Sequence, residues 1–178
     1  SNSLAGTLFA ASTFITMLRE PAVEIAAYHT LLGGSMGLFD IPDAPAPEVL
    51  PARKYPYFFW NMFASIVDNV DTTQAADMRG NDAAAAYVSE HLRLQAFKGN
   101  QRLYLLAVND GASPVRLAFP GTSGIAARGR WRAIRAGTQL GSIAVKRGGR
   151  DPIDSGTYAN NVVIEPLSIV LIEPRPGH

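Results

Sequence analysis

The sequence predicts a mainly antiparallel β protein: a jelly-roll-like β-sandwich preceded by two or three helices. Up to about residue 70, apolar residues recur at three- and four-residue spacing, which is helical spacing. From about residue 88, about seven short strand-like segments follow one another at roughly 8–12-residue spacing, which is typical of a sandwich. Residues 1–89 hold 9 acids and 4 bases, whereas residues 90–178 hold 6 acids and 12 bases. We therefore expect a helical segment over 1–82 and a β-sandwich over 83–178.

The first part of the chain divides into helices, a short strand and a proline-rich loop. Five apolar residues share one helical face and predict a first helix: Leu4, Leu8, Ala11, Ile15 and Leu18. Pro21 should end or kink that helix and open a second one, which carries the residues from Val23 to Leu31 and which Gly33-Gly34 ends. We expect a strand at 36–41, an extended loop from Ile41 to Pro56, a helix over 57–70 and a polar connection over 71–82.

The second part is predicted to consist of strands. Alternating polar and apolar residues predict a half-buried strand over 88–96, and Lys98-Gly99-Asn100 predicts a hairpin turn. The segment 102–109 is apolar on both faces, so we expect it to be a central strand. Further strands are predicted near 115–119, 130–135, 139–145, 161–164 and 168–173.

Composition excludes several classes of function. With 47% hydrophobic and 17% charged residues, the chain is not intrinsically disordered, and 178 residues are too few for a complete (β/α)8 barrel together with anything else. The chain has no cysteine, which excludes disulfides, thiolate metal sites and cysteine nucleophiles. His29, His91 and His178 have no metal-ligand spacing, and no phosphate-cradling loop is present, so we expect no metal and no cofactor. The net charge of +1 and an apolar segment too short for a membrane span predict neither specific nucleic-acid binding nor a membrane partner.

Four residues are candidates for contact with a sugar. The aromatic cluster at 55–63 has helical spacing, so most of it is expected to be core, with Tyr55 and Tyr57 as its exposed members. Trp131 lies among basic residues, and Asp40 is the only acid at the end of an expected strand beside a possible cleft. Glycoside hydrolysis needs two carboxyl groups about 5–10 Å apart, and one acid does not supply that pair.

A basic stretch is the strongest charge feature, because no acid occurs between Asp110 and Asp151. Its members are Arg128, Arg130, Arg132, Arg135, Lys146, Arg147 and Arg150. It is either an electropositive face for nucleic acid or an acidic polysaccharide, or a solvated sheet face on which Arg130 and Arg132 alternate with a buried Trp131. The alternation favours the solvated face.

The order of the elements resembles the C-terminal region of a clan-A glycoside hydrolase of the α-L-arabinofuranosidase type. The segment from Ala5 to Tyr28 resembles a late barrel helix, and Tyr55 to Phe63 resembles the last barrel helix. Arg102–Asn109 resembles the strand of the C-terminal sandwich that ends in asparagine, and Pro166–Leu171 resembles its closing strand.

This resemblance implies a structural or accessory portion whose partner is a missing N-terminal catalytic barrel. Both catalytic glutamates of the family would precede Ser1, so we expect no catalytic residue in this chain, although the parent would be an enzyme. The resemblance also implies an extracellular or periplasmic location. The alternatives are a stand-alone carbohydrate-binding module, using Tyr55, Tyr57 or Trp131, and an interaction module that uses the basic face.

Overall fold

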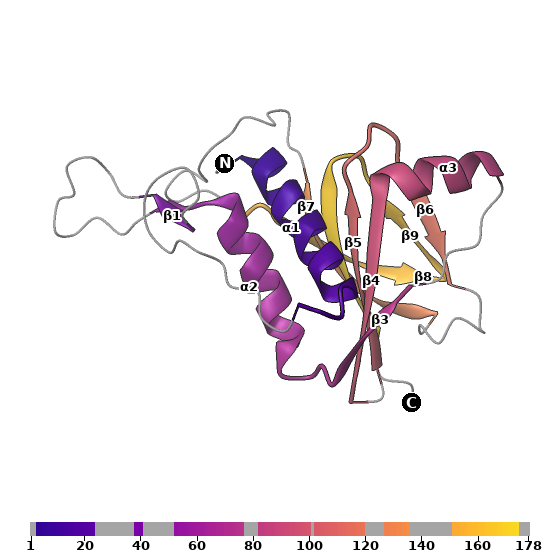
Figure 1. The fold of residues 1–178 in the computed structure, drawn as a ribbon, viewed down its shortest axis with the longest axis horizontal. Coiled ribbons are helices and arrows are strands. Elements are labelled where there is room, and N and C mark those ends of the chain that lie inside the picture. The colour runs from indigo at the N-terminus through magenta and orange to yellow at the C-terminus, as the bar shows by residue number, and fades with distance from the viewer. Residues whose placement is uncertain are drawn as a thin grey trace, which may run out of the picture.

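The computed structural model describes residues 3–23, 38–40, 52–76, 82–100, 102–119, 127–135 and 151–174. It confirms the predicted fold class, a mainly antiparallel β-sandwich preceded by helices (Figure 1). The described elements are α1 (Leu4–Arg19), β1 (Phe39–Asp40), β2 (Ala52–Arg53), α2 (Tyr55–Val67), β3 (Thr72–Ala75), α3 (Asp82–His91), β4 (Leu92–Gly99), β5 (Arg102–Asn109), β6 (Val115–Ala118), β7 (Arg128–Arg135), β8 (Ile153–Ala159), β9 (Asn161–Ile164) and β10 (Ser168–Pro174).

Capping and proline residues account for where α1 begins and ends and for where α2 begins. The Ser3 hydroxyl accepts a hydrogen bond from the Gly6 N–H at 3.3 Å and caps α1. The helix ends at Arg19 because Glu20 precedes Pro21 and takes an extended conformation. α2 begins at Tyr55, so the prediction of a loop as far as Pro56 is wrong. Pro56 lies in the first turn, where a helix does not need its missing N–H.

Within the described ranges, eight strands form one continuous antiparallel sheet in the order β3-β4-β5-β10-β7-β8-β9-β6. The predicted central strand is confirmed, because β5 lies between β4 and β10 and is apolar on both faces. The predicted hairpin between β4 and β5 is also confirmed, with Asn100 at φ 48°. The second helix predicted to open at Pro21 does not begin there, because residues 21 and 22 form a turn; the rest of that helix and the strand predicted over 139–145 lie outside the described residues.

Three differences from the expected elements have local causes. The strand predicted from residue 88 begins at Leu92, because residues 88–91 complete α3 and β5 pairs with β4 only from Leu92 onward. The polar connection predicted over 71–82 contains β3, an edge strand whose Thr72, Thr73 and Gln74 are exposed. β8 was not expected, because exposed polar residues occupy much of one of its faces.

The sheet curls around one apolar core on its inner side, and the helices pack against its outer side. On the inner side, residues of β4, β5, β10 and β7 pack against Tyr158, Val162 and Ile164 from β8 and β9. On the outer side, α1 and α2 pack side by side on the same four strands through a second apolar cluster (Figure 1). β5 and β10 contribute alternate residues to both cores.

Candidate functional site

The two N-terminal helices carry almost no charge on any side. α1 has a single charged residue, Arg19, and α2 has none. Each helix buries one side against the sheet, yet Phe9 is 74% exposed, Met17 39% and Val67 47%. Helices that face water on one side normally carry charged residues there, whereas helices that are apolar all round are buried. The exposed side of these helices is therefore a candidate interface, here called the helix surface (Ala5, Phe9, Thr16, Met17, Asn61, Ala64, Ser65 and Val67).

α1 is tied to the sheet at its C-terminal end. The Arg19 guanidinium donates to the Leu94 carbonyl, and its Nε donates to the Gln95 Oε1 at 3.3 Å. Gln95, which is buried, donates in turn to the Gln74 carbonyl of β3 at 2.7 Å. The only charged group of α1 thus fixes the helix across β4 and β3.

α2 is tied to the sheet through Arg132 of β7. The Arg132 Nε donates to the Glu173 Oε1 at 2.5 Å, and the guanidinium also donates to the Met62 carbonyl at 3.2 Å and to the Ser65 hydroxyl. Met62 and Ser65 lie near the C-terminal end of α2, where a positive charge is favourable. Arg132 therefore joins β7, β10 and α2.

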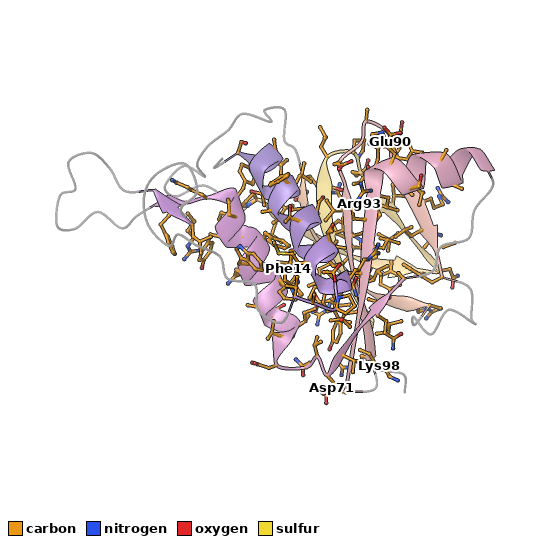
Figure 2. All side chains as sticks on the ribbon, viewed as in Figure 1. Phe14, Asp71, Glu90, Arg93 and Lys98 are labelled. Atoms are coloured by element: carbon orange, nitrogen blue, oxygen red, sulfur yellow. The ribbon has the colours of Figure 1, made fainter. Side chains whose placement is uncertain are left out.

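An aromatic layer fills the space between the helices and the sheet. The Phe14 ring of α1 meets Trp60 and Phe63 of α2 edge to face, with ring centroids 5.2 and 5.0 Å apart, and it lies between the two helices in Figure 2. Phe63 then meets Phe97 of β4 at 5.2 Å. The expectation that most of the aromatic cluster at 55–63 is core is confirmed.

The structure brings two of the predicted sugar-contacting residues to one corner. Asp40 ends β1, which pairs with β2, and the neighbouring Phe39 ring lies 5.0 Å from the Tyr57 ring. The Arg53 guanidinium lies over the Tyr57 ring at 5.0 Å, so a half-buried Tyr57 is held between two neighbours. The expectation that Tyr55 is exposed is wrong, because it is 8% exposed at the start of α2. Sugar contact at Tyr55, Tyr57, Trp131 and Asp40 stays a prediction.

Trp131 lies on the opposite side of the sheet from this corner. It belongs to the inner cluster, and a Cβ atom on the cross-strand residue Gly156 would lie 2.7 Å from its ring. The Arg135 guanidinium lies over the ring at 4.9 Å. Trp131 therefore does not share a surface with Tyr57, and the predicted sugar-contacting residues do not form one site.

A polar cluster at the end of β5 was not expected from the sequence. The Asn109 side-chain amide donates to the carbonyls of Ser113, Ile164 and Glu165 and accepts from the Gly111 N–H at 3.1 Å. His91, expected on a strand, ends α3, and its Nδ1 lies 3.2 Å from the Asp110 Oδ1. These contacts fix α3 and the β5–β6 loop, which is a structural role.

Among the residues that the structure describes, no group of three or more His, Cys, Asp or Glu side chains could hold a metal ion. Within the same ranges, none of the helices combines the length and apolar character that a membrane span requires. The strongest feature with no role inside the described fold is the helix surface. Sequence reasoning missed it, although the absence of charge over 4–18 and 55–67 was a readable signal.

The fold belongs to a class found in glycoside hydrolases. The chain matches part of the arabinose-bound α-L-arabinofuranosidase MgGH51 with a TM-score of 0.67 and 13% identity, covering 96% of this chain and 27% of that one. It matches the xylanase Xyn30A of glycoside hydrolase family 30 subfamily 8 from Clostridium acetobutylicum with a TM-score of 0.60 and 12% identity, covering 98% of this chain and 40% of that one. No protein-family model and no curated protein matches the sequence. The predicted resemblance to the C-terminal region of a clan-A glycoside hydrolase is confirmed as a likeness of fold.

Proposed function

We propose that this chain is the C-terminal β-sandwich portion of a glycoside hydrolase, and that α1 and α2 pack against a catalytic barrel formed by another part of the enzyme. Its role is structural: it covers that side of the barrel and contributes no catalytic carboxylate. The observation that carries the proposal is the helix surface, two uncharged helices with only one side buried.

Two further observations support it. α1 and α2 are anchored to the sheet at their C-terminal ends by Arg19 and Arg132, so they would form a rigid platform for a partner. The chain spans 27% and 40% of the two glycoside hydrolases whose fold it shares, which leaves room in such an enzyme for a separate catalytic part.

The first test is activity. The purified chain should not hydrolyse aryl α-L-arabinofuranosides or aryl β-xylosides, whereas the longer translation product that includes a barrel should hydrolyse one of them. Turnover by the chain alone that disappears in Glu165→Gln or Glu173→Gln would contradict the proposal.

The second test uses the most exposed apolar residue of the helices. Phe9→Glu should change the stability of the chain alone by less than about 0.5 kcal/mol, because the side chain is exposed. In the longer enzyme it should lower the stability of the assembled protein by about 2 kcal/mol or more, because it removes a buried ring and introduces an unpaired charge.

Val163→Glu is the matched control, because Val163 is an exposed apolar residue of β9, away from the helices. Thermal unfolding of both variants of the longer enzyme gives the comparison. Equal effects of the two variants would show that Phe9 is not in an interface.

A further inference from the structure

Three arginines lie at one end of the outer sheet face. Ile172 of β10 is level with Leu105 of β5 on one side and with Trp131 of β7 on the other. β5 and β7 therefore run parallel to each other with β10 between them, and Arg102 is level with Arg128. Side chains alternate between the faces of a strand, so Arg102, Arg128 and Arg130 share the face of Tyr104 and Ile134, which belong to the outer cluster.

Asp71 is exposed and level with Gly99, two strands from Arg102, so it lies toward the Arg102 side of this region. The two acids near Arg128 and Arg130 are engaged elsewhere. Glu173 is the cross-strand neighbour of Arg130, but its carboxylate accepts from Arg132 at 2.5 Å. Asp154 lies on the other face of β8, beside Arg135 at 3.8 Å. Arg128 and Arg130 are exposed, and neither forms an ion pair with an acid in the described ranges. The result is a positive surface, here called the arginine face (Arg102, Arg128 and Arg130).

We propose that the arginine face binds the carboxylates of an acidic polysaccharide. Residues two apart on a strand lie roughly 7 Å from each other along one face, so Arg128 and Arg130 present two guanidinium groups in a row, with Arg102 about 10 Å to the side across β10. A guanidinium binds a carboxylate through two parallel hydrogen bonds. A polymer that repeats carboxylates engages several arginines at once, which raises its affinity over that of a single sugar acid. The exposed Thr157, cross-strand to Arg130, adds a hydroxyl for sugar contacts.

The surface fits a polysaccharide better than a nucleic acid. Proteins that bind single strands stack bases on aromatic side chains, but Trp131, the aromatic residue between Arg130 and Arg132, faces the inner core. The net charge of the whole chain is +1, so no long-range field concentrates nucleic acid on it. The choice of a polysaccharide also rests on the proposed function in a glycoside hydrolase.

The test compares two polymers with the same sugar backbone, one with free carboxylates and one whose carboxyl groups are neutral methyl esters. Polygalacturonate and the same polymer fully methyl-esterified are titrated into the chain by calorimetry at low salt. We expect the acid polymer to bind, the ester to bind at least about tenfold more weakly, and added salt to weaken the acid polymer's binding. Arg130→Gln should weaken polygalacturonate binding about tenfold, and Arg128→Gln combined with it should weaken it further.

Arg116→Gln is the matched control, because Arg116 is an exposed arginine on β6 at the far edge of the sheet. It should change the affinity less than twofold. Equal binding of the two polymers, an equal loss in Arg116→Gln, or tighter binding of single-stranded oligothymidylate than of polygalacturonate would each overturn the proposal. Phe9→Glu, which tests the proposed function, should leave polygalacturonate binding unchanged, so the two proposals fail separately.

Discussion

At the scale of single residues, burial decides the behaviour of Tyr158. Its ring lies on the inner face of β8, 5.4 Å from the ring of Phe119 and directly opposite Gly129 of β7. Desolvation raises the pKa of Tyr158 from 10.0 to about 12. The same crowding accounts for Gly129, because a Cβ atom there would lie 2.6 Å from the Tyr158 ring.

The raised pKa predicts a loss of stability at alkaline pH. In the folded chain Tyr158 keeps its proton up to about pH 12, whereas in the unfolded chain it loses it near pH 10. The unfolded state therefore binds fewer protons between these values, and the free energy of unfolding falls as the pH rises. The contribution of Tyr158 to the free energy of unfolding is fully present below pH 10.

Urea denaturation at pH 9 and at pH 11.5 checks this prediction. Tyr158→Phe should lose less stability between the two pH values than the unchanged chain, since it lacks the titrating group. Tyr57→Phe is the control, because it removes a tyrosine hydroxyl on the outer side of the sheet and leaves Tyr158 in place. Identical losses in the unchanged chain and in Tyr158→Phe would refute the assignment.

At the scale of elements, the contact of Arg132 with Glu173 determines how firmly α2 is held. Both side chains are 25% exposed, and the Arg132 guanidinium also donates a hydrogen bond to the Met62 carbonyl of α2. Arg132→Met should destabilise the chain by about 1–3 kcal/mol, because the half-buried Glu173 carboxylate and the Met62 carbonyl both lose the hydrogen bond that Arg132 donates.

The double variant Arg132→Met with Glu173→Met measures the pair itself. It should be less destabilised than the sum of the two single variants, because neither charge is left without its partner. Denaturant unfolding of all four proteins gives the coupling energy. Strict additivity would mean that the two residues do not act together.

Element types could be predicted where periodicity was long or strong. α1, β5 and β9 were predicted almost residue by residue from spacing and composition. α3 could not be, because the polar alternation from Ser89 suits a strand, and only the pairing of β4 with β5 shows where the strand begins. The sequence shows an asparagine, Asn109, at the end of a predicted strand. It does not show that the Asn109 side chain binds the carbonyls of Ile164 and Glu165, which lie more than 50 residues further along the chain.

At the scale of the whole molecule, the helices and the sheet share one apolar cluster, so we expect them to unfold together. Trp60 on α2 and Trp131 on β7 are the only tryptophans and report on the helix layer and on the inner core. Single-tryptophan variants should give coincident fluorescence transitions in urea.

Phe59→Ala in the outer core should lower both midpoints, with a loss of about 3–5 kcal/mol. An earlier transition at Trp60 than at Trp131 would instead support independent units. The predicted division into 1–82 and 83–178 would then describe folding units, not only composition.

The candidate sites could be predicted only in part, for a reason that also belongs to this scale. Residue type pointed to Tyr57, Trp131 and the arginines, but which of them share a surface depends on which side of the sheet each one faces. Trp131 packs on the inner side of the sheet and Tyr57 on the outer side, and strand register gathers Arg102 with Arg128, which are 26 residues apart in the sequence. Neither fact is local in sequence.

The position of β10 has a consequence for synthesis of the chain on the ribosome. β10 follows every other described strand, yet it lies between β5 and β7 and is the only strand that pairs the group β3-β4-β5 with the group β7-β8-β9-β6 in the described sheet. Until β10 has left the exit tunnel, each group keeps an unpaired strand edge. The inner and outer cores both also lack the apolar residues that β10 contributes. The nascent chain must therefore wait for one late strand before it can close, and over that interval its open strand edges are sites for aggregation or for chaperones.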